Sequence, residues 1–228
     1  MAKKNPLEKT LYPLVARWVR RHFLCFRIAV NKGLRYSRID VLGIRDVGGD
    51  LSGDVETIAV EVKRGSTPFT NAAGQTVGYK VYANRVYLAD VRDEPFNQDE
   101  LLIASNLGIG LIRIKGKKCQ EVLSSPCYNP IGKLQLQLFE RLGLGKCQLC
   151  SSLFKIEEPE DRTSYTNVSR ENVTLAIKAE KGLAFWIREL GERRAKLGLC
   201  KTDCVYDRRF ICADCVSGVL ATLYGGKV

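Results

Sequence analysis

The chain of 228 residues is long enough for one large domain, or for a domain with a smaller module beside it. Its 36 Lys and Arg against 25 Asp and Glu give a net charge of +11, which favours a polyanionic partner, DNA before an anionic membrane. No apolar run reaches the roughly 18 residues that a membrane span needs, and the charged start MAKKNPLEKT lacks the apolar segment of a signal peptide. We therefore expect a cytoplasmic protein with no membrane contact.

The first half of the chain alternates helical and β-type patterns. Residues 7–22 predict an amphipathic helix, which Pro13 should kink or restart and whose apolar face carries Leu7, Leu11, Leu14, Val15 and Trp18. Runs at 25–30, 37–46 and 56–65 predict three neighbouring antiparallel strands, because a Gly- and Asp-rich link joins the last two. A helix at 71–83, a strand at 85–90, a helix at 99–107 and a strand at 108–114 then predict a crossover and a parallel pair.

Two domains follow from this order of elements. Residues 1–117 should form an α/β domain with a central mixed sheet flanked by helices. Residues 118–228 should form a smaller, α-helical, cysteine-rich module, with helices at 131–142 and 171–197. Arg17, Arg20 and Arg21 lie on the first helix, and some basic residues of this kind should contact phosphates.

A carboxylate–lysine pattern occurs in the strands. Glu61 and Lys63 are two residues apart in an apolar run, so their side chains should point to the same face. If Asp40 lies on the adjoining strand, its carboxylate meets that of Glu61, and the two repel unless a cation joins them. Mg²⁺ uses one or two carboxylates plus waters and phosphate oxygens, and Lys63 beside it can orient or deprotonate a water. The pattern therefore favours phosphodiester hydrolysis over the alternative, a salt-bridged edge of a sheet.

These residues and elements resemble the PD-(D/E)XK nuclease superfamily, which includes restriction endonucleases, archaeal Holliday-junction resolvases and RecB-type nucleases. The resemblance covers roughly residues 5–115, with Ile39 before Asp40 in place of a Pro that many other members also lack. The matching residues are Asp40 in RIDVLGI, Glu61-Val62-Lys63 in IAVEVKRG, Gln75 and Tyr79 in GQTVGYKVY, and Glu8 in LEKTLYP.

The resemblance implies a restriction-endonuclease-like fold and a deoxyribonuclease that uses Mg²⁺ or Mn²⁺. Asp40 and Glu61 would hold the metal, and Lys63 would position or activate the attacking water. Gln75 would orient the lysine or contact the substrate, and Glu8 would hold a metal-bound water or a second metal. Cutting both strands of DNA would favour a homodimer. The alternative function is a catalytically silent nucleic-acid-binding protein on the same fold, which leaves the retained Asp, Glu and Lys unexplained.

Nine cysteines and a single histidine, His22, indicate a thiolate-bound metal rather than histidine chemistry. The two Cys-x2-Cys pairs, Cys147 with Cys150 and Cys212 with Cys215, suit one structural, tetrahedral Zn²⁺. In a second arrangement Cys200 and Cys204 join Cys212 and Cys215, while Cys147 and Cys150 join Cys119 and Cys127. An iron–sulfur cluster is a further alternative to zinc, and Cys25 should be a buried core thiol.

Overall fold

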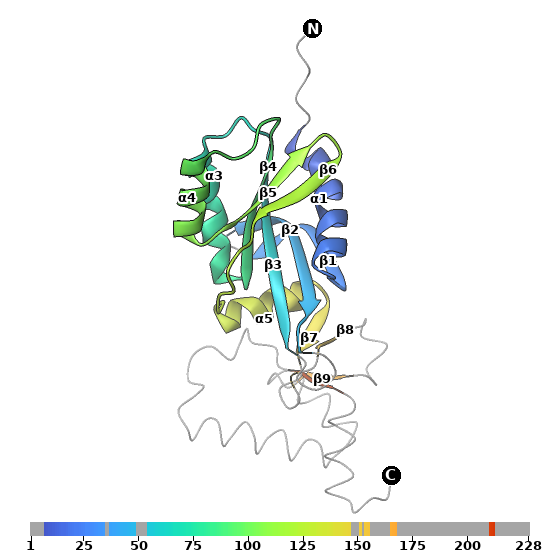
Figure 1. Cartoon of the computed structure of the whole chain (residues 1–228). Helices are drawn as coiled ribbons and strands as arrows, with labels where there is room; N and C mark the ends of the chain where they lie inside the picture. The colour runs from blue at the N-terminus through green and yellow to red at the C-terminus, as the bar shows by residue number, and fades with distance from the viewer. Residues whose placement is uncertain are drawn as a thin grey trace, which may run out of the picture. The chain divides into compact units, whose positions relative to one another are not determined.

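The computed structural model describes residues 7–34, 37–48, 54–146, 151, 153–155, 165–167 and 210–212. The chain divides into two compact units. The first unit runs to Leu138 and contains a six-stranded sheet with helices on both faces (Figure 1). It therefore has the expected α/β architecture with a mixed sheet.

The six strands follow one another across the sheet in sequence order, from β1 to β6. Antiparallel pairs join β1 (Arg27–Leu34), β2 (Ser37–Asp46) and β3 (Val55–Lys63). Parallel pairs join β3, β4 (Arg85–Val91) and β5 (Gly110–Lys115), because helices connect these strands. An antiparallel hairpin adds β6 (Lys118–Leu123) at the far edge. The antiparallel meander and the parallel crossover are both confirmed.

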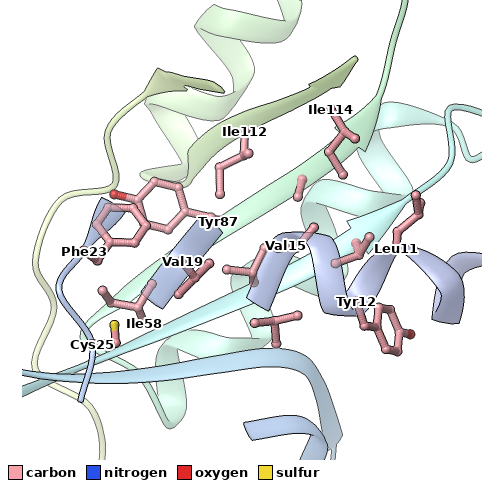
Figure 2. Packing of buried hydrophobic residues seen from close by; sticks show 14 residues of the cluster. Leu11, Tyr12, Val15, Val19, Phe23, Cys25, Ile58, Tyr87, Ile112 and Ile114 are labelled. Atoms are coloured by element: carbon pink, nitrogen blue, oxygen red, sulfur yellow. The ribbon is translucent and has the colours of Figure 1, made fainter. Parts of the chain in front are cut away.

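One face of the sheet is covered by α1 (Glu8–His22). Alternate side chains of four strands pack against this helix, with Val60 and Val62 of β3 on its side of the sheet. Figure 2 shows Val15 and Val19 over the strands, and Tyr12 at the end of the cluster with its hydroxyl directed away from the packed side chains. The helix thus buries an apolar stripe and presents one hydroxyl at its border.

The other face of the sheet is covered by α3 (Phe69–Gly78), the short 3-10 turn η1 (Tyr79–Val81) and α4 (Gln98–Leu107) (Figure 1). The start of α4 is fixed by a reciprocal pair in which Asn97 accepts from the Glu100 N–H and Glu100 accepts from the Asn97 N–H. Its end is fixed by Gly108 in the left-handed conformation. After β6, α5 (Gly132–Arg141) begins within the first unit, where Gln135 donates to Thr57 and Asn84.

The second unit contributes two small antiparallel pairs to the described residues. One pair joins β7 (Leu144–Lys146) to β8 (Leu153–Lys155). The other joins β9 (Tyr165–Asn167) to β10 (Phe210–Cys212). The helix expected over 171–197 lies outside the described residues.

The structure corrects three expectations. The sheet continues past residue 117 into β6, so the expected domain boundary cuts the β5–β6 hairpin. Helix α1 runs unbroken through Pro13. Its buried face also differs, because Leu7 is the N-cap and is 70% exposed, while Tyr12 and Val19 are buried. Within the described ranges, no helix is both long and apolar enough to cross a membrane.

Candidate active site

The candidate site lies where β2 and β3 part. Their ladder pairs Val41 with Val60, a register that brings Asp40 alongside Glu61. The pairing ends there, and the Val62 N–H donates to Asp40 Oδ2 at 2.9 Å. The carboxylate therefore replaces a strand carbonyl as the acceptor, which holds Asp40 against β3.

A second donor fixes the other oxygen of Asp40. The Tyr12 hydroxyl of α1 donates to Asp40 Oδ1 at 2.6 Å, a short distance typical of a bond to a charged acceptor. Since one donor comes from β3 and the other from α1, the orientation of this carboxylate depends on the packing of α1 on the sheet. Sequence reasoning placed the carboxylate on the correct strand but missed Tyr12.

Glu61 and Lys63 lie on the same face of β3, as expected, and form an ion pair with Lys63 Nζ 2.6 Å from Glu61 Oε1. Both are buried, at 6% and 8% exposure. The Tyr79 hydroxyl contacts Glu61 Oε2 and also lies 2.7 Å from the Arg38 carbonyl oxygen. Its single proton serves one of these acceptors at a time, so Tyr79 links Glu61 to the backbone of β2.

The electrostatics of Asp40 differ from those of an ordinary surface carboxylate. Burial raises the pKa of the Asp40 carboxyl to about 6, and the negative charge of Glu61 adds to the rise. The Tyr12 hydroxyl, the Val62 N–H and the Lys63 charge oppose it. The two carboxylates are therefore close enough to repel, and Asp40 lacks a direct cationic partner among the described residues.

The protonation of the two flanking donors follows from the same charges. Burial lowers the pKa of Lys63, but the hydrogen bond and charge of Glu61 outweigh it, so the net pKa of Lys63 is raised. Burial and then Asp40 raise the pKa of the Tyr12 hydroxyl well above its usual value. At neutral pH Lys63 is thus an ammonium and Tyr12 a neutral donor.

The two peripheral candidates are placed differently. Glu8 is the first residue of α1 and is half-buried, and its charge raises the pKa of both Lys63 and Tyr12. Gln75 is exposed on α3, and its side chain forms no hydrogen bond with any other described residue. The structure therefore brings Glu8 to the site, while Gln75 lies one helical turn before Tyr79 without touching the carboxylates.

The carboxylate oxygens of Asp40 and Glu61 can together bind one hard cation, such as Mg²⁺. Each carboxylate oxygen of Asp40 and Glu61 is engaged by one donor, which leaves a second lone pair on each. A cation here would relieve the repulsion that contributes to the raised pKa of Asp40. Within the described ranges no group of three His, Cys, Asp or Glu side chains could hold a metal, so the protein would supply two ligands and water the rest, as is usual for Mg²⁺.

The structure describes only part of the cysteine set. Cys147, Cys150, Cys200, Cys204 and Cys215 lie outside the described residues, and Cys212 ends β10. Cys119 is half-buried and packs against the core beneath α1, whereas Cys127 is exposed, with Sγ 3.3 Å from Glu56 Oε1. Cys25 is buried, with a pKa raised to about 11 by burial. The core thiol has the expected placement, and the zinc site stays a prediction.

Two residues that the sequence did not indicate, Tyr12 and Asp90, complete the site together with Tyr79, which the resemblance had named without a role. Tyr12 and Tyr79 hold the two carboxylates, and Asp90 accepts from the Gly65 N–H at 2.7 Å, just beyond Lys63. Asp90 also accepts from Arg92 at 3.0 Å. For Asp90 and Tyr12 the only signals in the sequence were an aspartate ending an apolar strand and a tyrosine one turn after Glu8. The ring of Tyr82, by contrast, is buried as a packing residue.

Comparisons with known proteins assign the chain to no family. No model of a known protein family matches the chain, and no curated protein matches its sequence. One solved structure that resembles it is the SPO1766 protein of unknown function from Silicibacter pomeroyi, with 23% identity and a TM-score of 0.44. The match covers 60% of this chain and 85% of that protein, and a likeness of this size carries no argument about activity.

Proposed function

We propose that this chain is a Mg²⁺- or Mn²⁺-dependent nuclease that hydrolyses phosphodiester bonds in DNA, with the PD-(D/E)XK site that the sequence resembles. One observation carries the proposal. Two carboxylates from neighbouring strands, Asp40 and Glu61, are close enough to repel, and a buried ammonium, Lys63, contacts one of them. A salt-bridged sheet edge accounts for Glu61 with Lys63, but not for Asp40, which is held by uncharged donors.

Each residue has a role that its surroundings support. A divalent ion held by Asp40 and Glu61 would polarise the scissile phosphate and acidify the attacking water. Tyr12 and the Val62 N–H orient Asp40, and Tyr79 orients Glu61. These bonds pre-set the carboxylates, which reduces the reorganisation needed when substrate binds.

The raised pKa of Lys63 bears on the two roles open to it, positioning or activating the attacking water. A general base must be neutral when it accepts a proton, and the interaction with Glu61 keeps this amine protonated. In the metal-free site Lys63 is therefore suited to position the attacking water or to stabilise charge on the phosphate, whereas a cation bound to Glu61 would lower the pKa of the amine towards that of a general base. To reach the water or the phosphate, its ammonium must share or exchange its contact with Glu61.

The test is cleavage of supercoiled and linear DNA with Mg²⁺, with Mn²⁺ and with EDTA. Asp40→Asn, Glu61→Gln and Lys63→Met should each lower the metal-dependent rate by about 100-fold or more. Glu56→Gln is the matched control. Glu56 lies on the same strand as Glu61, about 16 Å before it along the strand, and it pairs with Arg45 and Arg85 instead of Lys63. It should cleave at close to the wild-type rate.

The outcomes separate the two functions considered. Cleavage that survives EDTA, or that the three site variants retain, would refute the metal-dependent nuclease. DNA binding without cleavage under any of these metals would favour the catalytically silent binding protein. A homodimer stays a prediction, which the same preparations test by light scattering.

A further inference from the structure

The turn between β5 and β6 carries a compact group of positive charges. The register pairs Lys115 with Lys118, so the turn consists of Gly116 and Lys117 alone. Gly116 has a φ of 60°, the left-handed region that such a tight turn requires and that glycine adopts without strain. We call Lys115, Lys117 and Lys118 the lysine hairpin, and all three are exposed.

These charges are uncompensated within the part of the chain that the structure describes. None of the three lysines forms a salt bridge with another described residue. Lys115 and Lys118 are also directly opposite across the hairpin, where like charges destabilise a strand pair. The lysine hairpin thus costs a little stability in isolation, and a polyanion bound to it would remove that cost.

The lysine hairpin lies at the same end of the sheet as the candidate site, the end where the parallel strands finish. Strands β3, β4 and β5 are parallel, so their carboxyl ends meet there (Figure 1). The registers align Lys63 with Asp90 and Asp90 with Arg113, two residues before Lys115. Two strand spacings across and two residues along place Lys115 about 12 Å from Lys63, between Cα atoms.

That separation suits a nucleic acid. About 12 Å corresponds to three or four base-pair steps of a duplex, at about 3.4 Å each. We propose that the lysine hairpin binds the phosphate backbone of nucleic acid a few nucleotides from the phosphate held at Asp40, Glu61 and Lys63. The identity of this ligand rests on the proposed function, whereas its recognition through phosphate charge does not require cleavage.

The experiment measures binding of a fluorescent DNA duplex of about 30 base pairs by anisotropy, in EDTA, from about 50 to about 200 mM salt. The test variant replaces Lys115, Lys117 and Lys118 with Gln, and a second variant replaces them with Arg. The α1 control replaces Arg17, Arg20 and Arg21 with Gln, and it compares the lysine hairpin with the phosphate contacts that the sequence suggested on this helix. These three arginines are also exposed, and they form no salt bridge within the described part of the chain.

The Gln variant of the lysine hairpin should bind about 10- to 100-fold more weakly at about 0.1 M salt. The slope of log affinity against log salt should fall by about two to three, near one for each lost phosphate contact. The Arg variant should bind like the wild type, and its binding also shows that changes at this turn are compatible with folding. The α1 control should lose less than half as much affinity for the duplex, on a logarithmic scale, as the Gln variant of the lysine hairpin.

Three results would overturn the inference: unchanged binding by the Gln variant, an equal loss in the α1 control, or no binding by the wild type. Binding is measured without a divalent metal, so its outcome is separate from that of the cleavage assay. Loss of binding in the Gln variant would support the lysine hairpin even if no metal restored cleavage. Cleavage with normal binding by the Gln variant would leave the nuclease standing and remove this surface.

Discussion

The free energy of unfolding of the Asp40→Asn variant, compared with that of the wild type, should increase as the pH rises. The ionised carboxylate of Asp40 is held partly buried beside Glu61, which raises its pKa to about 6, whereas an aspartate in the unfolded chain has a pKa near 4. The folded wild type therefore binds this proton more tightly than the unfolded chain does. Its stability falls as the pH rises from about 4 to above 6, and the amide of the variant has no such proton to lose.

The magnitude follows from the difference between the two pKa values. Two pKa units correspond to about 3 kcal/mol if Asp40 were fully shielded from water. Because the side chain is only half-buried, screening reduces this to about 1–2 kcal/mol. The difference in free energy of unfolding, variant minus wild type, should thus grow by about 1–2 kcal/mol between about pH 4.5 and about pH 8.

Urea denaturation followed by circular dichroism, over a series of buffers, measures this difference directly. Asparagine is isosteric with aspartate and can still accept from the Val62 N–H, so both proteins should unfold with similar slopes. A difference that stays constant with pH, or that shifts in favour of the wild type at high pH, would refute the reasoning. It would mean that Asp40 is well solvated or is paired with a cation.

Glu56→Gln provides a control at a carboxylate whose pKa is lowered in the fold, whereas the pKa of Asp40 is raised. Burial would raise the pKa of Glu56, but Arg85 and Arg45 outweigh it and hold the pKa at about 2. The ionised carboxylate therefore stabilises the fold at all pH values above the unfolded pKa near 4.3, and this stability is lost only as the pH falls towards 2. The deficit of Glu56→Gln should be nearly constant above about pH 5, in contrast with Asp40→Asn.

Three further predictions test the site and the packing around it. At pH 8, Mg²⁺ in tenfold excess over its Kd should stabilise the wild type by about 1.4 kcal/mol, and Asp40→Asn by much less; equal shifts in scanning fluorimetry would contradict the metal site. Tyr12→Phe should cost about 1.5–3 kcal/mol at pH 8 and about 1 kcal/mol at pH 5, where Asp40 is protonated; a loss independent of pH in urea titrations would argue against the charged bond. Gly110→Ala should destabilise by about 1–3 kcal/mol, since a Cβ there would lie 2.3 Å from two ring carbons of Tyr87. Gly74→Ala, which meets nothing within 4 Å on α3, should stabilise by about 0.5–1 kcal/mol; thermal melts in the reverse order would exclude this account of the two glycines.

The strand-level prediction succeeded where the signal is local. The two-residue alternation of a strand requires Glu61 and Lys63 to share a face whatever the rest of the chain does. The turn-rich link before β3 and the helix between β4 and β5 are likewise encoded over short distances, so the antiparallel strands and one parallel pair could be predicted. Strand β6 was not predicted because its first four residues, Lys118 to Glu121, alternate Cys119 and Glu121 on the inward side with Lys118 and Gln120, and so lack an apolar pattern.

The sequence by itself determined the strands that carry the candidate site, the antiparallel direction of β2 and β3, and the chemical types of the site residues, because each depends on neighbours a few residues away. Only the tertiary structure decided that Tyr12 of α1 donates to Asp40 and that Tyr79 contacts Glu61. Those contacts join residues 28 and 18 positions apart in sequence, so they depend on how two helices pack on opposite faces of one sheet. The raised pKa of Asp40 has the same origin, since burial exists only once the layers have closed around the carboxylate.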